Sequence, residues 1–280
     1  MKEEVCLYHS PDLIFHHSIT PTDRPFQNQL HAHEMHEVLV ILSGEGVMQV
    51  EGNEHPFAAG SVLLMRAGES HRIRLNQGVP YERLGIRFHP SLVAPLDPEG
   101  ALFIPFQERR LGTGNHFRLY CLEGLLPSVM DLTEESSSYR IRLTLTSFLC
   151  SLLVEAGNLY RQKEQGVEER KELGKIYDII EYVNHNLSLD LSLDAIAGRF
   201  YLSKSQLSRS FKKATGSTLW DYVLIKRLLL ARSLIREGES VSQACEDSGF
   251  REYSSFYRAY KKRFGISPTK DRMASKNKRK

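Results

Sequence analysis

Apolar and polar residues follow two different patterns along the chain. Between about residues 28 and 90, short alternating segments are separated by turn residues, and the clearest of them cover residues 37–42, 47–51 and 60–65. Strands that recur at such short intervals predict an antiparallel sandwich or a small barrel. After residue 105 the apolar residues recur every three or four positions, which predicts helices over 117–126 and 141–159. Everything beyond residue 173 also has a helical pattern.

The predicted helix over 141–159 has one strongly apolar face. The residues on that face are Leu145, Phe148, Leu149, Leu152 and Leu153. Such a stripe has to be covered, either by the barrel of the same chain or by a second subunit. We expect a segment over 106–162 to mediate a homodimer, and core packing within the chain is the alternative for the stripe.

The charge is divided unevenly between the two parts of the chain. Residues 1–170 contain 15 Lys and Arg against 22 Asp and Glu, whereas residues 171–280 contain 22 against 12. The net charge of +3 therefore combines an acidic first part with a strongly basic second part, which favours a polyanion such as nucleic acid as a partner. The charged run over 163–174 predicts a linker between the parts, and residues 273–280 form a basic tail.

The basic part contains a repeat with a constant offset of 49 residues. The identical pairs are Ser205/Ser254, Arg209/Arg258, Lys212/Lys261, Lys213/Lys262 and Gly216/Gly265. Apolar positions correspond as well, Leu207 with Phe256 and Phe211 with Tyr260, and their spacing of four places them on the buried face of a helix. Each copy follows a turn and a short predicted helix, over 193–199 or 241–247, so two helix-turn-helix units are predicted.

The second helix of each unit carries side chains that suit DNA. In the first copy, Ser205, Ser208 and Arg209 can reach base edges, while Lys212 and Lys213 suit phosphates. The corresponding residues of the second copy are Tyr253, Ser254, Tyr257, Arg258, Lys261 and Lys262. Because the pattern is repeated, we favour DNA contact over a merely solvated face and predict double-stranded promoter DNA as the partner.

Residues 175–272 resemble the DNA-binding domain of AraC-type (AraC/XylS) transcription regulators. The resemblance rests on the two helix-turn-helix units, a long predicted helix over 219–235 between them and the closing segment 265–272. One departure is Ala244-Cys245, where the family usually has a larger aliphatic residue followed by alanine. The resemblance implies transcription regulation, by an activator or a repressor, with RNA polymerase as a further partner of an activator. It also implies recognition helices in successive major grooves about 34 Å apart.

Two segments resemble the motifs of cupin domains, HxHxxxExxxxxxG from residue 31 and GxxxxxRxGxxH from residue 60. The resemblance implies a small antiparallel barrel over 1–105. The motif residues suited to ligand binding are His31, His33, Glu37 and His71. On strands the first three would project to one face, which His71 could join from a neighbouring strand. His36 would point the other way, to the surface.

The four cupin-motif residues have three interpretations. AraC-type regulators commonly keep this barrel as an effector pocket without metal, so we expect these residues to bind a small polar molecule, a carbohydrate or related metabolite, with no metal or other cofactor. Three imidazoles and one carboxylate would also suit Zn²⁺, Fe²⁺ or Mn²⁺, and a metal-dependent cupin enzyme or metal sensor is the alternative. An empty, purely structural barrel is the third interpretation.

Arginines recur around the second motif, at Arg66, Arg72, Arg74, Arg83 and Arg87, and Arg66 stands where cupins usually have proline. Alternation with apolar residues predicts that the arginines share a face. Inside the barrel they would favour an anion such as a sugar acid or a phosphosugar. Outside, where we expect them, they would only add solubility.

Cysteine spacing and the N-terminus bear on location. The four cysteines lack a CxxC spacing, no signal peptide is recognisable, and no apolar run reaches the roughly 18 residues that cross a bilayer. We expect a cytoplasmic protein without a membrane role, and not an enzyme, because no nucleophile motif is present. The chain is therefore predicted to be multidomain: an N-terminal all-β cupin barrel, an α-helical dimerisation segment and a C-terminal all-α domain with two helix-turn-helix units.

Overall fold

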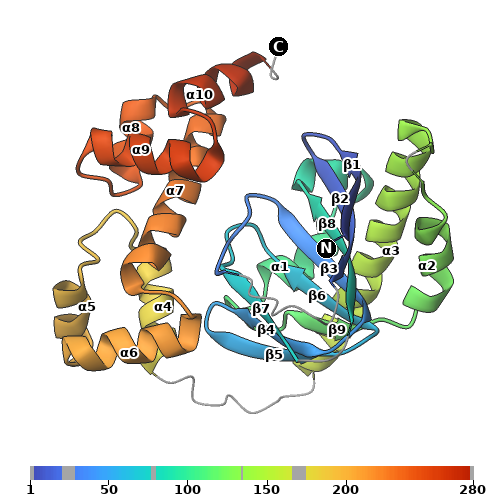
Figure 1. Cartoon of the computed structure of the whole chain (residues 1–280), viewed down its shortest axis with the longest axis horizontal. Helices are drawn as coiled ribbons and strands as arrows, with labels where there is room; N and C mark the ends of the chain where they lie inside the picture. Colours follow the sequence, from blue (N-terminus) through green and yellow to red (C-terminus); the bar gives the residue numbers. More distant parts are fainter. Residues whose placement is uncertain (1–2, 21–28, 77–79, 134, 166–174, 278–280) are drawn as a thin grey trace. The chain divides into compact units, whose positions relative to one another are not determined.

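The structure of the protein is a computed structural model that describes residues 3–20, 29–76, 80–133, 135–165 and 175–277 (Figure 1). The chain divides into two compact units, Met1–Lys171 and Glu172–Lys280. The predicted linker over 163–174 lies largely outside the described residues, because the described helix before it ends at Gln165 and the next begins at Lys175.

The described strands of the first unit form two sheets. A six-stranded sheet has the order β1-β2-β8-β3-β6-β9, and a three-stranded sheet has the order β5-β4-β7. The named strand pairs are all antiparallel. This architecture confirms the predicted β-rich N-terminal region. The strands are β1 (Glu3–His9), β2 (Leu13–Thr20), β3 (His36–Ser43), β4 (Gly46–Val50), β5 (Asn53–Phe57), β6 (Ser61–Met65), β7 (His71–Leu75), β8 (Tyr81–Phe88) and β9 (His116–Arg118).

Side chains of the six-stranded sheet alternate between two buried layers. Along β3, Leu39 and Ile41 enter a core between the two sheets, whereas Val38 and Val40 enter a second core between the six-stranded sheet and the helices. Burial on both faces explains why β3 has a continuous apolar run over 38–42. The other residues of the inter-sheet core are Met48, Val50, Phe57, Leu63, Met65, Ile73 and Tyr81.

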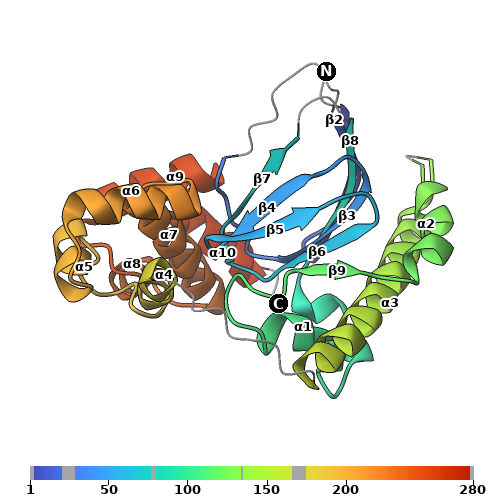
Figure 2. The ribbon, with the colours of Figure 1, turned by 90° about the horizontal axis from the view of Figure 1, so that it is seen from below.

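Helices cover the outer face of the six-stranded sheet, and α2 and α3 lie along it in both views (Figures 1 and 2). The predicted start of a helix at Phe117 is wrong, because Phe117 lies on β9, where it pairs with Val62 of β6 and is buried. Tertiary pairing here overrides the local helical pattern. The helices are η1 (Pro90–Leu92), η2 (Ala94–Leu96), η3 (Ala101–Phe103), α1 (Ile104–Gln107), α2 (Leu122–Met130) and α3 (Ser138–Gln165).

The apolar stripe of α3 belongs to the core of its own chain. Leu145, Phe148, Leu149, Leu152 and Leu153 are each at most 1% exposed and pack in the core that α3 shares with the six-stranded sheet. A subunit seam made by this stripe is therefore wrong, and core packing is confirmed. The physical reason is that the outer face of the sheet is itself apolar and needs a cover of this size.

By length and composition α3 is also able to cross a membrane, since the span Ser138–Gln162 contains an 18-residue window with a mean hydropathy of 1.2. Polar residues interrupt this window, so it is not the uninterrupted apolar run of roughly 18 residues that the sequence lacks. The helix has the features of a core helix, because 44% of the window is buried within the unit and the sheet covers its apolar stripe.

The regular elements described in the second unit are all helices, as predicted. The helices predicted over 193–199 and 241–247 are confirmed, and the long helix predicted over 219–235 ends at Glu237. The last helix includes part of the predicted basic tail, whose residues 278–280 lie outside the described residues. The helices are α4 (Lys175–His185), α5 (Leu193–Arg199), α6 (Lys204–Thr215), α7 (Leu219–Glu237), α8 (Val241–Asp247), α9 (Tyr253–Phe264) and α10 (Pro268–Asn277).

Arg227 of α7 connects the two helix-turn-helix units. Its Nε donates to the carbonyl of Leu187 at 2.9 Å, and its Nη2 donates to the carbonyl of Leu189 at 2.7 Å, both in the loop before α5. Gly249, in the turn between α8 and α9, packs against the same carbonyl of Leu187 and has a φ of 84°, so a Cβ there would collide with it. These contacts fix the spacing between the two helix-turn-helix units.

Candidate functional site

The second helix of each helix-turn-helix unit buries one face and exposes the other. α6 buries Leu207 and Phe211, and α9 buries Phe256 and Tyr260, all with 0% exposure. Of the side chains predicted to contact DNA, Tyr257 is half-buried and the others are exposed: Ser205, Ser208, Arg209, Lys212, Lys213, Tyr253, Ser254, Arg258, Lys261 and Lys262. The structure makes these groups accessible, and their contacts with bases and phosphates stay predictions.

The positive charges gather in the last turn of each of these two helices. Lys212 and Lys213 lie in the last turn of α6, and Lys261 and Lys262 lie in the last turn of α9. Cations at this end of a helix are favoured by the helix dipole. The sequence reasoning missed Arg227, which positions the units, because an arginine in a long helix carries no signal that separates it from a solvated one.

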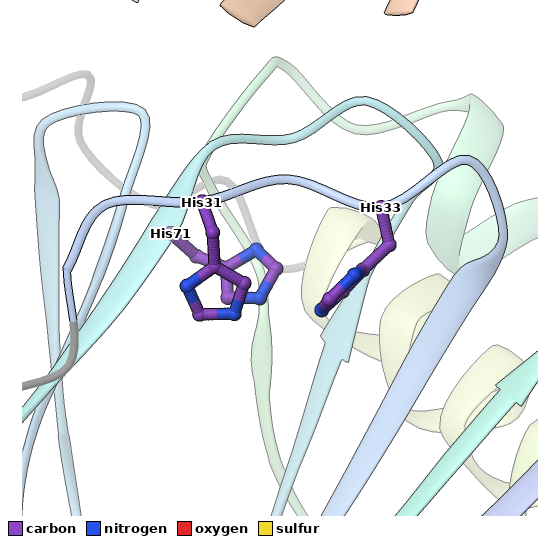
Figure 3. A group of neighbouring side chains, drawn as sticks. All are labelled: His31, His33 and His71. Carbon is purple, nitrogen blue, oxygen red and sulfur yellow. The ribbon is translucent and has the colours of Figure 1, made fainter. Parts of the chain in front are cut away.

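Three histidines of the first unit form a cluster (Figure 3). One ring nitrogen each from His31, His33 and His71 lies within 4.8 Å of the others. His31 and His33 precede β3 rather than lie on it. The backbone instead brings the rings together, because His31 pairs with His71 of β7 in an isolated antiparallel bridge with N···O distances of 3.0 and 2.8 Å. The predicted residues therefore converge, but not through the predicted alternation along one strand.

Glu37 of β3 joins the histidine cluster from within the barrel. Its carboxylate lies 3.0 Å from Nε2 of His71 and 3.6 Å from Nε2 of His33. Burial opposes ionisation of Glu37, but the imidazoles hold its pKa well below the ordinary value. Burial also opposes protonation of His71, and the Glu37 carboxylate outweighs it and raises the pKa of His71. His33 stays neutral because burial lowers its pKa to about 3.

Backbone carbonyls orient two of the rings. Nδ1 of His31 lies 2.8 Å from the carbonyl of Gln29, and Nδ1 of His71 lies 2.8 Å from the carbonyl of Glu69. A carbonyl that accepts from Nδ1–H fixes the ring and directs Nε2 toward a ligand, as in many metal sites. The cluster therefore fits two chemistries, hydrogen bonding to the hydroxyl groups of a small molecule and coordination of Zn²⁺, Fe²⁺ or Mn²⁺.

His36 points away from the cluster, as predicted, but it is half-buried and not an exposed surface residue. Its ring packs against Phe88, Phe103 and Phe106 with centroid distances of 5.5, 5.8 and 4.5 Å. Its Nδ1 accepts a hydrogen bond from the backbone N–H of Ala67 at 3.1 Å. Burial among these rings lowers the pKa of His36 to about 4, so the ring is neutral and structural. The outward direction of a strand here leads to the helical layer and not to solvent.

The arginines of β7 point outward, as expected. His71 and Ile73 are buried, so Arg72 and Arg74 lie on the opposite side of β7. Arg74 donates to Glu54 at 2.6 Å, and both side chains are about half exposed.

The prediction that all the arginines share one outward face is wrong for the arginines of β8. Tyr81 enters the inter-sheet core, and Arg83 and Arg87 follow it on the same inward side of the strand. Nη1 of Arg87 lies 3.5 Å from Nδ1 of His33, so Arg87 belongs to the cluster. Alternation along one strand shows which residues share a side, but not on which side the barrel core lies.

The chain is similar to known proteins over both units. A helix-turn-helix domain model matches residues 196–274, and a cupin domain model matches residues 23–82. The HTH-type transcriptional activator RhaR of Mannheimia succiniciproducens is 23% identical over 245 residues, which covers 87% of this chain and 86% of RhaR. The multiple antibiotic resistance protein MarA of Escherichia coli is 32% identical over 101 residues, 36% of this chain and 80% of MarA. A structure of apo ToxT from Vibrio cholerae covers 94% of this chain and 98% of ToxT, with 14% identity and a TM-score of 0.43.

Proposed function

The chain belongs to the AraC-type transcription regulators and carries an N-terminal cupin domain, and on this premise we propose that it activates transcription from specific promoters in response to a small molecule bound in the barrel. The observation that carries the proposal is the pair of exposed recognition helices, α6 and α9, built on one repeated pattern. The relative aligned over most of its length, RhaR, is named a transcriptional activator. Regulation rather than catalysis is therefore the activity we propose.

In this proposal α6 and α9 enter successive major grooves on one side of the duplex, about 34 Å apart. Ser205, Ser208 and Arg209 read bases from α6, with Lys212 and Lys213 on phosphates. Tyr253, Ser254, Tyr257 and Arg258 read bases from α9, with Lys261 and Lys262 on phosphates. Because several cations meet phosphates, affinity should fall steeply with salt.

Arginine and lysine variants of α6 and α9 test this assignment. Arg209→Ala and Arg258→Ala should each cost about 1–3 kcal/mol on a selected operator, because a bidentate contact to a guanine is lost. Lys212→Ala should weaken all sequences alike, because phosphates carry no sequence information. Fluorescence anisotropy at fixed salt, with an operator chosen from random duplexes and a scrambled duplex as control, measures both effects. Operator binding at wild-type strength by both arginine variants would contradict the groove assignment.

The effector site in this proposal is the cluster of His31, His33, Glu37 and His71. Neutral imidazole, imidazolium and carboxylate offer hydrogen-bond acceptors and donors within a few ångströms, a combination that suits the hydroxyl groups of a carbohydrate or related metabolite. Binding would act on transcription by favouring one arrangement of the two units or of two subunits.

Further partners and the location are part of the same proposal. A homodimer through segment 106–162 could use the outward side of α3, where Tyr139, Leu143 and Val154 are exposed apolar residues. RNA polymerase is the expected partner of an activator bound at a promoter. Regulators of this family work in the cytoplasm, where their DNA is, and we place this chain there.

The metal alternative is favoured by one observation, the approach of three ring nitrogens within 4.8 Å. If the cluster holds a metal, Zn²⁺, Mn²⁺ or Fe²⁺ at about 100 times its dissociation constant should stabilise the full chain by about 2.7 kcal/mol. A chelator and the variant His33→Ala should each remove the effect, whereas His9→Ala, at an exposed position outside the cluster, should not. Thermal unfolding measures this, and a midpoint that no metal shifts would count against the metal sensor or metal-dependent enzyme.

A further inference from the structure

The inward side of β8 carries two arginines in a row of otherwise uncharged positions. In the antiparallel register, Arg83 lies opposite Ile41 and Gly85 lies opposite Leu39, and both of these partners belong to the inter-sheet core. Directly opposed residues project to the same side of a sheet. Gly85 leaves room for a side chain from the neighbouring strand, because a Cβ there would collide with the ring of His16. The row therefore faces the barrel interior.

Arg87 brings a guanidinium to the histidine cluster that forms no ion pair with the described residues. It lies opposite Glu37 in the register, but the Glu37 carboxylate is engaged by His71 and His33. The contact that Arg87 makes among the described residues is with the imidazole of His33, at 3.5 Å, and not with a carboxylate. Its Nε is buried and has no hydrogen-bond partner in the part of the chain that the structure describes. A guanidinium held in this way attracts an anion.

Arg83 and Ser18 extend the same surface further into the barrel. Arg83 is 8% exposed, and its Nη1 lies 3.4 Å from the hydroxyl of Tyr81. Ser18, opposite Arg83 on β2, is 1% exposed, and its hydroxyl has no hydrogen-bond partner within the described ranges. A buried hydroxyl of this kind is usually satisfied by water or a ligand. Arg87, Arg83 and Ser18 therefore form a row of donors beside the histidine cluster.

We propose that the effector is an anion whose carboxylate or phosphate group binds Arg87, with Arg83 and Ser18 as further donors, while its hydroxyl groups meet the histidine cluster. The inference rests on the proposed effector function and adds the charge class of the ligand. The guanidinium supplies two parallel N–H donors that match the oxygen atoms of a carboxylate or a phosphate, and each such bond is charge-assisted. A neutral sugar would leave both inward arginines without a counter-charge from the ligand.

Calorimetric titration of the full chain with matched ligands tests the charge class. The carboxylate arm compares D-glucuronate with D-glucose and D-galacturonate with D-galactose, and the phosphate arm compares glucose 6-phosphate with glucose. We expect at least one anion to bind at least about tenfold more tightly than its neutral partner, which corresponds to one charge-assisted hydrogen bond. The arm that binds distinguishes a sugar acid from a sugar phosphate.

Three variants connect binding to the inward arginine. Arg87→Gln should weaken the anion at least about tenfold, and Arg87→Lys, which keeps the charge, should weaken it less. Arg74→Gln, the matched control on the outward side of β7, should bind like the wild type. Unfolding midpoints without ligand show whether each variant is folded, and the lysine variant keeps the test valid if the glutamine variant is not.

The outcomes separate this inference from the function on which it rests. Equal binding of a neutral sugar and its acid, unchanged in Arg87→Gln, would overturn the anion and leave effector sensing intact. If none of the three anions binds, the anion inference is overturned, and binding of a neutral sugar in the same titration would support effector sensing without it. Promoter binding by α6 and α9 would be untouched in either case.

Discussion

Replacing Leu149 with aspartate should unfold the first unit, and this is the largest effect that we expect from one substitution. Leu149 is 0% exposed and packs in the core between α3 and the six-stranded sheet. Aspartate would remove these contacts and place a carboxylate in an apolar layer, at a cost of more than about 4 kcal/mol. The whole unfolding free energy of a domain is only about 5–15 kcal/mol. The substitution therefore threatens folding and not the association of subunits.

Leu143→Asp is the matched control, because Leu143 lies on the same helix with 54% of its surface exposed. It should change the unfolding free energy by no more than about 0.5 kcal/mol. Circular dichroism and thermal unfolding of the full chain compare the two variants, and sedimentation measures their mass. A dimer through the outward side of α3 predicts a smaller mass for Leu143→Asp with its fold intact. A normally folded Leu149→Asp protein would contradict the assignment of this apolar stripe to the core.

The helical second unit was predictable because its signals are local. A repeat at a fixed offset places Arg209 and Arg258 at equivalent positions, and apolar residues four apart orient each helix without knowledge of the rest of the fold. Helix ends are also coded nearby, for example by Ser203, whose hydroxyl accepts from the N–H of Gln206 at the start of α6. The contacts of Arg227 were not predictable, because they join segments about forty residues apart.

The barrel was predictable in class but not in its faces. β2 lies outside the predicted strands, because its inward positions include His16 and Ser18, polar residues that break the apolar alternation expected of a buried strand. Phe117 fits a helical spacing, but it lies on β9, an edge strand of the six-stranded sheet. This strand forms by pairing with β6, which is distant in the sequence. Arg87 and Arg72 look alike in sequence and face opposite sides, because sheet pairing decides which face is inside.

For the histidine cluster too, the sequence predicted which residues take part but not how the fold brings them together. The spacing of His31, His33, Glu37 and His71 indicated residues that the fold brings together, since it is a motif and not a periodicity, and their role in binding stays a prediction. The path by which they meet, a backbone bridge between His31 and His71, has no local signal. The pairing of Glu37 with His71, which sets the charges of the cluster, depends on burial that only the folded barrel supplies.

A buried ion pair next to this cluster is the second place where a large effect is expected. Nη1 and Nη2 of Arg109 each donate to the Glu69 carboxylate at 2.6 Å, and both side chains are at most 1% exposed. The carboxylate also accepts from the N–H groups of Arg66 and Gly112. Burial raises the pKa of Glu69, but Arg109 outweighs burial and lowers it to about 2. The carbonyl of Glu69 accepts from His71, so the pair also supports the cluster.

Arg109→Met should lower the unfolding free energy by about 3–5 kcal/mol, because it removes the bidentate partner of the buried Glu69 carboxylate and leaves it with the more distant Nε of Arg66, at 3.4 Å. Glu69→Gln with Arg109→Met should recover part of the loss, since the amide carries no charge and its single oxygen still accepts from one of the two N–H groups. In the single variant the pKa of Glu69 rises, so its deficit should shrink as the pH falls through that raised value. Urea unfolding at two pH values measures this. The control is Arg74→Met, whose exposed pair with Glu54 should cost less than about 1 kcal/mol to lose, and similar losses for Arg109→Met and Arg74→Met would refute the importance of the buried pair.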